Sequence, residues 1–352
     1  MNSVGFSILD ASLPVVDADP RDLPDQRGEF GASYRAALAA TESSPAVHAA
    51  VAARERQALA LLAAQWQAGD FTARYGLKRL LSVGSTRRDL YGQLPVDFDL
   101  MVETEVSQDR IDRDHLRPLL LRLTEQIAAA PEFRPLPEEG VQLEAVTLAS
   151  FKLHGQGSLV GRLDATLEQD DGVKRRFPLV DITFGNLART ANYALWMDAF
   201  FARLPSERAR RQKQEIRLAK RLFKALGVMY GPAETGLGSI AIEQWVLQSP
   251  ARISCGIPGG TLDGLLRHVA GAGDAHSSFA DYARRWPVWR PGCSDDDIPT
   301  GQIRPGINLL DAGAFGEATD PWQRIVAMAG RYVRLRAENA AWLPETLAGQ
   351  HV

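Results

Sequence analysis

The chain has 352 residues, of which 45% are apolar and 24% charged, an ordinary composition for a globular protein with room for two domains. Forty basic and forty-three acidic residues give a net charge of -3, which argues against a general nucleic-acid coat protein because such a protein needs clustered positive charge. The two cysteines, Cys255 and Cys293, lie far apart without metal-ligand spacing, so neither a zinc site nor a disulfide framework is expected.

The ends and apolar segments of the chain bear on its location. The opening sequence MNSVGFSILD has no basic region ahead of an apolar run, so it does not resemble a secretory signal. No apolar run approaches the roughly 20 residues that cross a membrane. We therefore expect a cytoplasmic protein without a membrane partner.

The first half of the chain alternates strands with helices. Residues 1–30 are rich in Pro, Asp and Gly, and we expect an N-terminal arm over residues 1–40. Helices are predicted over residues 46–67 and from residue 113 to the residue before Pro131. One or two helical turns are expected in TRRDLYG. Strands are predicted in LKRLLSV, VDFDLMVE, VQLEAVTLASFKL, GRLDATLEQ and KRRFPLVDITFG, and Asp170-Asp171-Gly172 predicts a hairpin between the last two.

The second half is different in character. Residues 188–250 are predicted to be mostly helical, and residues 251–318 are rich in Gly and Pro and are predicted to be rich in loops, with CGIPGGTLDG as one of them. A last helix is expected to begin with Asp320 as its cap and Pro321 in its first turn. The pattern predicts an α+β fold, with a small mixed sheet in residues 41–190 and a helical domain in residues 191–352.

Two acids in PVDFDL share one side of a predicted strand. Side chains alternate between the faces of a strand, so Val96, Phe98 and Leu100 share one face, and Asp97 and Asp99 share the other. Two carboxylates about 6–7 Å apart repel each other unless a cation lies between them. Mg²⁺ binds such a pair together with substrate phosphates. A solvated strand face would also produce this pattern.

A third acid, Asp181, interrupts the apolar strand FPLVDITFG. A lone acid among apolar residues needs a partner, because burying it unpaired is costly. One alternative is an ion pair with an arginine. If this strand lies beside the first, three carboxylates surround one point, as in sites that hold two metal ions about 3.5–4 Å apart.

A Gly-Ser turn precedes the first two acids. Gly84 lets backbone N–H groups approach a phosphate closely, and a helix beginning after the turn would favour its negative charge. The Ser85 hydroxyl adds a donor, and Arg88 can reach a phosphate from one turn later.

A basic helix is predicted in RARRQKQEIRLAKRLFKALG, ending at Gly227. Ile216, Ala219, Phe223 and Leu226 form an apolar stripe. A basic stripe on another side consists of Arg210, Lys213, Arg217, Lys220 and Lys224. The basic stripe is either a solvated face or a source of positive charge for a triphosphate.

These segments together resemble a known family. GSTRRDLYGQLPVDFD resembles the hallmark of polymerase-β-like nucleotidyltransferases, in which Gly-Ser is followed by two acids and a later third acid. QEIRLAKRLFKALGVMYGPAETGLGSIAIEQWVLQS is similar to the helical segment of class I, archaeal-type CCA-adding enzymes. Oligoadenylate synthases and cyclic-dinucleotide synthases share the same core. The resemblance covers residues 78–103 and 176–248.

The resemblance implies roles for particular residues. It implies that Asp97 and Asp99 bind metal, that Asp181 is the third ligand and the base, and that the cofactor is a pair of Mg²⁺ ions with Mn²⁺ as an alternative. With the turn and the basic helix, it gives these candidate nucleotide-binding residues: Gly84, Ser85, Arg88, Lys220, Lys224 and Tyr230.

The chain also departs from the CCA-adding pattern. The distance between the second and third acids is longer, with the hairpin at residues 170–172 inserted. Tyr193 stands where that family has a phosphate-binding histidine, and one extra residue separates Lys220 from Tyr230. The chain has no room for the long C-terminal part with which those enzymes hold tRNA.

The sequence therefore predicts an Mg²⁺-dependent nucleotidyltransferase that moves NMP from an NTP to a hydroxyl-type acceptor and releases pyrophosphate. The acceptor is expected to be short or small, and a small molecule, a nucleotide and an RNA 3′ end all fit. Alternatives are a CCA-adding type of RNA or tRNA nucleotidyltransferase, a synthase of linear or cyclic signalling oligonucleotides, and a catalytically inert nucleotide-binding module.

Overall fold

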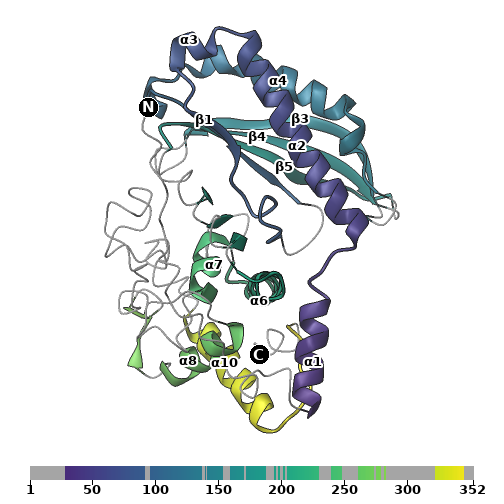
Figure 1. Cartoon of the computed structure of the whole chain (residues 1–352), viewed down its shortest axis with the longest axis vertical. Helices are drawn as coiled ribbons and strands as arrows, with labels where there is room; N and C mark the ends of the chain where they lie inside the picture. The colour runs from purple at the N-terminus through teal and green to yellow at the C-terminus, as the bar shows by residue number, and fades with distance from the viewer. Residues whose placement is uncertain are drawn as a thin grey trace. The chain divides into compact units, whose positions relative to one another are not determined.

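The computed structural model divides the chain into two compact units (Figure 1). One unit is Ser43–Phe200, here called the palm, and the other combines Met1–Glu42 with Phe201–Val352, here called the helical unit. The structure describes residues 28–91, 96–136, 139, 141–153, 159–169, 172–187, 194–195, 197–198, 201–202, 204–229, 239–247, 261–272, 275–278, 281–282 and 322–344. In these ranges no helix is long and apolar enough to cross a membrane.

The palm is built on a five-stranded mixed sheet in the order β1-β2-β5-β4-β3. Its strands are β1 (Arg79–Ser82), β2 (Phe98–Glu103), β3 (Val141–Leu153), β4 (Leu159–Gln169) and β5 (Lys174–Gly185). β2 and β5 are parallel, and the other neighbouring strands are antiparallel. All five strands predicted from the sequence are present, and the expected α+β fold with a mixed sheet is confirmed.

Helices cover one face of the sheet (Figure 1). They are α2 (Pro45–Ala68) and α4 (Arg113–Ala129), with the short α3 (Phe71–Tyr75) and the 3-10 turns η3 (Gln108–Arg110) and η4 (Pro131–Phe133) between elements. The strands contribute alternate residues to a core shared with these helices, including Phe98 and Leu100 of β2 and Val180 and Ile182 of β5. The acids between these positions are therefore on the other face of the sheet.

A buried ion pair fixes α2 to the segment that leads into β3. The Arg54 guanidinium donates to both carboxylate oxygens of Glu139, at 2.8 and 2.6 Å, and to two backbone carbonyls. The Leu136 amide also donates to Glu139. Burial acts to raise the pKa of Glu139, but the hydrogen bonds from Arg54 and Leu136 outweigh it and lower the pKa. The pair thus favours the charged form of Glu139.

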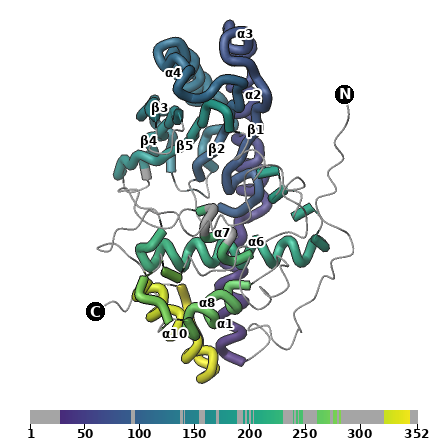
Figure 2. Tube along the Cα trace, turned by 90° about the vertical axis from the view of Figure 1, so that its left-hand side faces the viewer, coloured from purple at the N-terminus to yellow at the C-terminus, as the bar shows by residue number. Residues whose placement is uncertain are grey.

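The helical unit takes elements from both ends of the described chain. They are α1 (Gly28–Ala39), α6 (Ser206–Ala225), α7 (Ser239–Leu247), α8 (Leu262–Ala272) and α10 (Trp322–Ala337). Figure 2 shows α8 and α10 lying together beside α6. Residues 28–39, which were expected to belong to an arm, form a helix whose Phe30, Tyr34 and Leu38 are buried.

The structure corrects one expectation in this unit, since α8 begins inside CGIPGGTLDG, which was predicted to be a loop. The Gly264 amide donates to the Thr261 hydroxyl, which caps the start of the helix. Leu262, Leu265, Leu266 and Val269 are buried and recur at helical spacing. The expected cap at Asp320 and Pro321 lies outside the described residues.

A buried carboxylate joins three helices of this unit. Glu215 of α6 accepts hydrogen bonds from the Tyr34 hydroxyl at 2.5 Å, from Arg211 Nε at 3.0 Å, and from the Leu262 amide at 3.0 Å. Because that amide belongs to the first residue of α8, the carboxylate also interacts with the positive end of the helix. Burial raises the pKa of Glu215, and Arg211 acts against this rise.

Candidate functional site

The three acids singled out in the sequence lie on two neighbouring strands of the palm. Asp99 of β2 stands directly opposite Asp181 of β5 in the parallel register, and Asp97 precedes β2 by one residue. Val96, Phe98 and Leu100 are buried, while Asp97 and Asp99 are half-buried, so the alternation expected from the sequence is confirmed. Neighbouring strands are about 4.8 Å apart, which places Asp99 and Asp181 within reach of one cation.

Gly84 lies against the side chain of Asp99. A Cβ atom placed on Gly84 would be 2.1 Å from Asp99 Oδ2 and 2.7 Å from Asp99 Cβ. The Val83 amide donates to the Asp99 carbonyl at 2.9 Å and continues the pairing of β1 with β2 past the end of β1. The turn therefore requires glycine at position 84, because any side chain there would collide with Asp99.

Hydrogen bonds to α2 hold the Gly-Ser turn. The hydroxyls of Ser82 and Thr86, one on each side of the turn, both donate to Glu55 Oε1. Ser85 itself is half-buried, and its carbonyl accepts the Leu90 amide at 2.7 Å. Glu55 was not singled out in the sequence, and only its place on the helix behind the turn reveals its role.

The helical turns expected after Ser85 do not form. Residues 85–89 make a hydrogen-bonded turn that closes with the Asp89 and Leu90 amides, and Asp89 takes a positive φ of 57°. A residue in this left-handed conformation cannot continue a right-handed helix. The expected contribution of a helix N-terminus to phosphate binding is therefore absent from residues 84–91.

Arg88 supports this turn. It is 4% exposed, and its Nη1 donates to the Val83 carbonyl at 2.9 Å. Its expected contact with a phosphate stays a prediction.

An ion pair engages Asp181. Arg162 of β4 lies opposite Asp181 in the antiparallel register, and its Nε and Nη2 donate to Oδ1 and Oδ2 at 2.8 and 2.7 Å. The pKa of Arg162 is raised, first by its hydrogen bonds with Asp181 and further by the charges of Asp181, Asp164 and Asp97, while burial acts in the opposite direction. The structure therefore shows the alternative considered for Asp181, an ion pair with an arginine.

The carboxylates of the palm are suitable ligands for Mg²⁺, although they do not converge on one point in this structure. Proteins bind Mg²⁺ through one or two carboxylates together with substrate phosphates, and Asp97 and Asp99 with the opposed Asp181 supply such carboxylates. In the part of the chain that the structure describes, no three His, Cys, Asp or Glu side chains converge as a metal site. In this structure both oxygens of Asp181 accept hydrogen bonds from Arg162.

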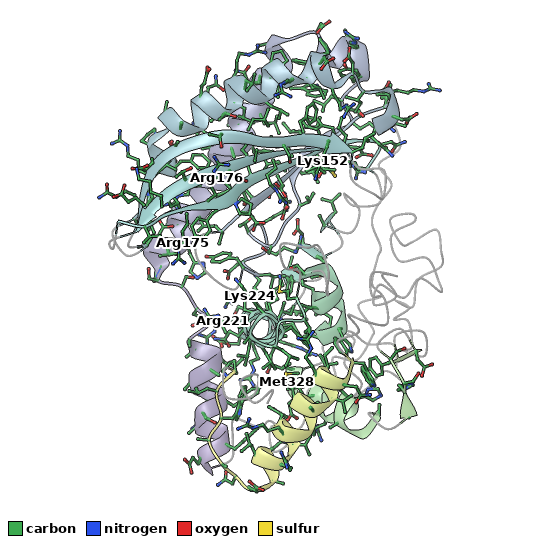
Figure 3. All side chains as sticks on the ribbon, turned by 180° about the vertical axis from the view of Figure 1, so that it is seen from behind. Lys152, Arg175, Arg176, Arg221, Lys224 and Met328 are labelled. Carbon is green, nitrogen blue, oxygen red and sulfur yellow. The ribbon has the colours of Figure 1, made fainter. Side chains whose placement is uncertain are left out.

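The remaining candidate residues lie in the helical unit. Lys220 of α6 is buried, and its ammonium group donates to Glu243 Oε1 of α7 at 2.7 Å. The Ser239 hydroxyl, at the start of α7, is 3.4 Å from the same oxygen. Lys224 is exposed, and Figure 3 labels it on α6. Tyr230 and Tyr193 lie outside the described residues.

The basic stripe of α6 is not a continuous exposed face. Arg217 and Lys220 are 2% and 4% exposed, whereas Arg210 is exposed and pairs with Glu207. The expectation of one basic face is thus wrong for these two residues, because helices pack on more than one side of α6. The predicted apolar stripe of Ile216, Ala219, Phe223 and Leu226 is buried as expected.

The sheet and its acid-bearing strands define the fold class. No family model matches the chain, and no curated protein matches it in sequence. Its fold is shared with a solved structure at 13% sequence identity.

Three solved structures are similar to this chain to different degrees. CdnC of E. coli MS115-1, in its complex with HORMA-deltaN, has a TM-score of 0.51 at 13% identity, over 90% of this chain and 93% of that one. mtPAP in complex with UTP has a TM-score of 0.48 at 11% identity, over 96% of this chain and 76% of that one. The c-di-GMP synthase CdnE from Capnocytophaga granulosa has a TM-score of 0.39 at 12% identity, over 86% and 84%.

Proposed function

We propose that the chain is an Mg²⁺-dependent nucleotidyltransferase that transfers NMP from an NTP to a hydroxyl acceptor. The observation that supports this most directly is the register of Asp99 opposite Asp181, with Asp97 two residues before Asp99, in a nucleotidyltransferase fold. A structural role for these acids would not require two of them to face each other across parallel strands, because like charges in that position repel.

The palm residues have separate parts in this proposal. Asp97, Asp99 and Asp181 would hold the Mg²⁺ ions. When bound, those ions would lower the pKa of the attacking hydroxyl and neutralise the triphosphate. The turn at Gly84 and Ser85 packs against Asp99 and is anchored through Glu55, and in this proposal its backbone amides and the Ser85 hydroxyl would donate to a phosphate next to the acids.

The reaction forms one bond and breaks one. The acceptor oxygen attacks the α-phosphorus of the NTP, and the bond from that phosphorus to the bridging oxygen of the β-phosphate breaks, so that pyrophosphate leaves. The Asp181 carboxylate takes the proton of the acceptor hydroxyl. For this step Asp181 must first part from Arg162, since its two oxygens accept hydrogen bonds from that guanidinium.

Lys220, Lys224 and Tyr230 complete the proposed triphosphate contacts. Lys220 is held by Glu243, and the Ser239 hydroxyl meets the same carboxylate, so these groups form a small polar centre between α6 and α7. A phosphate would compete with Glu243 for the Lys220 ammonium group. Lys224 is exposed one turn further along α6 and would contact the same triphosphate.

The acceptor is proposed to be short or small. A long nucleic acid requires an extended positive track, and its affinity falls steeply with salt. The net charge is -3, and burial removes Arg217 and Lys220 from the basic surface of α6. A nucleotide acceptor, which would make the product a linear or cyclic oligonucleotide, fits this limited charge better than a folded tRNA.

Nucleotide turnover provides the test. The protein is incubated with each labelled NTP and Mg²⁺, without acceptor, and both pyrophosphate and nucleotide products are measured. Oligonucleotides would identify a nucleotide acceptor. If pyrophosphate appears only after a short RNA or a small hydroxyl compound is added, the acceptor is that compound.

Two variants make the test specific. Asp99→Asn should abolish turnover and leave the fold intact, whereas Glu168→Gln, which removes a carboxylate at the far end of β4, should leave turnover unchanged. Equal rates in wild type and Asp99→Asn would contradict the proposal. Nucleotide binding without turnover under any acceptor would instead indicate an inert binding module.

A further inference from the structure

Arg162 covers the carboxylate that the proposed reaction needs. Its Nε and Nη2 contact separate oxygens of Asp181 at 2.8 and 2.7 Å, a fork-to-fork arrangement that occupies both oxygens at once. A cation bound by Asp181 needs at least one of these oxygens. A divalent cation therefore cannot bind Asp181 while Arg162 contacts both of its carboxylate oxygens.

The charge of Arg162 is suited to the position. Asp181 lies between Arg162 on β4 and Asp99 on β2, and Asp97 and Asp164 also attract the guanidinium. Without a cation, the acids on this face would repel one another. Arg162 supplies positive charge at this position before any metal ion arrives.

The pair is also open enough to separate. The Arg162 side chain is 41% exposed, while that of Asp181 is 15% exposed. The guanidinium can therefore turn into solvent without leaving a buried, unpaired arginine. Water competes for the exposed guanidinium and so weakens the pair, whereas the two-point contact with Asp181 strengthens it.

We propose that Arg162 is a positioning residue that stands in for a divalent cation at Asp181 and is displaced when that cation binds; this role rests on the proposed function. Arg162 stabilises the acidic face in the absence of metal. It also sets the metal concentration at which the site fills, because each cation that binds must break the ion pair.

Metal binding without nucleotide tests this role. The full chain is titrated with Mn²⁺, and free Mn²⁺ is followed by electron paramagnetic resonance. Arg162→Gln should bind Mn²⁺ about fivefold more tightly than wild type, the size expected when a partly exposed ion pair no longer competes. Arg176→Gln is the matched control, because it removes an exposed arginine from β5 (Figure 3) and should change the affinity less than about twofold.

Further variants separate this inference from the proposed function. In an Asp181→Asn background, Arg162→Gln should give no gain in affinity. If wild type binds Mn²⁺ and Asp99→Asn does not, the proposed metal site is supported. In that case, an Mn²⁺ affinity of Arg162→Gln that equals or falls below that of wild type overturns the role of Arg162. If Asp99→Asn binds Mn²⁺ as well as wild type does, the proposed function fails.

Stability gives a second readout. In EDTA, Arg162→Gln should unfold at a lower temperature than wild type. In Mg²⁺, the two proteins should unfold at the same temperature. A loss that Mg²⁺ does not restore would make Arg162 a structural partner only and overturn the proposal. Arg162→Lys keeps the charge but loses the two-point contact, and it should give an Mn²⁺ affinity between those of wild type and Arg162→Gln.

Discussion

Replacement of Gly84 by alanine tests whether the turn and the acids work as one unit. The added Cβ would be 2.1 Å from Asp99 Oδ2, and rotation of the carboxylate can relieve that contact. Rotation cannot relieve the 2.7 Å contact with Asp99 Cβ, which is fixed to the backbone of β2. Ordinary contacts begin at 3.4 Å, so the turn or β2 must move by about 0.7 Å.

The cost of this movement can be stated for two measurements. Overpacking of this kind costs about 1–3 kcal/mol, which lowers the melting temperature of a unit the size of the palm by roughly 2–12 °C. Displacement of Asp99 should also weaken Mn²⁺ binding and reduce turnover by on the order of 100-fold. Calorimetry measures the change in melting temperature, and the Mn²⁺ titration measures the change in metal affinity.

A control makes the result interpretable. Gly271→Ala makes the same chemical change in α8, where the new Cβ would meet nothing within 4 Å, and it should leave both measurements at wild-type values or slightly raise stability. If Gly84→Ala retained wild-type Mn²⁺ affinity and melting temperature, the close packing of the turn on Asp99 would be refuted.

Three further predictions concern buried charges. Glu139→Gln should cost the palm about 3 kcal/mol in urea unfolding at neutral pH, because it leaves Arg54 buried without its charge partner. The pKa of Glu139 in the folded state is lowered from 4.5, so the stability that its charge contributes is present above pH 4.5 and is lost as the pH falls through the folded-state pKa. The difference in unfolding free energy between Glu139→Gln and wild type should therefore disappear at that low pH. A difference that stays constant with pH would contradict the pairing. Lys220→Met and Glu243→Gln should each destabilise the helical unit by about 3 kcal/mol, while the double variant regains most of the loss; additive losses would mean that the two side chains act independently. Glu215→Gln should cost a similar amount, about 3 kcal/mol by calorimetry, and a change below about 0.5 kcal/mol would show that its contacts with the other helices carry no stability.

The sequence predicts the sheet well because its signals are local. Alternation from Val96 to Leu100 identifies a strand with one apolar face, and the apolar surroundings of Asp181 identify a buried strand with one polar position. The partner of Asp181 is not local. Arg162 meets it across a hairpin whose register shifts at a bulge between Leu163 and Asp164, and no sequence pattern gives that register.

The helical unit is less predictable for a related reason. A stripe of basic residues indicates a solvated face only when one side of a helix is buried, and α6 is covered on several sides, so Lys220 and Arg217 are enclosed. α8 could have been found, because Thr261 is a good cap and leucines follow at helical spacing. The surrounding Gly and Pro residues concealed this signal.

The split origin of the helical unit affects how the chain folds as it is made. The Phe30 ring lies edge-on to that of Tyr332 at 5.2 Å, and the Trp342 amide donates to the Ser33 hydroxyl, so α1 needs the last described segment to complete its packing. The palm, Ser43–Phe200, can fold once its own residues have left the ribosome. At about 5–20 residues per second, the apolar face of α1 then remains uncovered for roughly 7–28 seconds. During that interval the nascent chain carries a folded palm and an exposed helix, which is the state in which chaperones or aggregation would act on it.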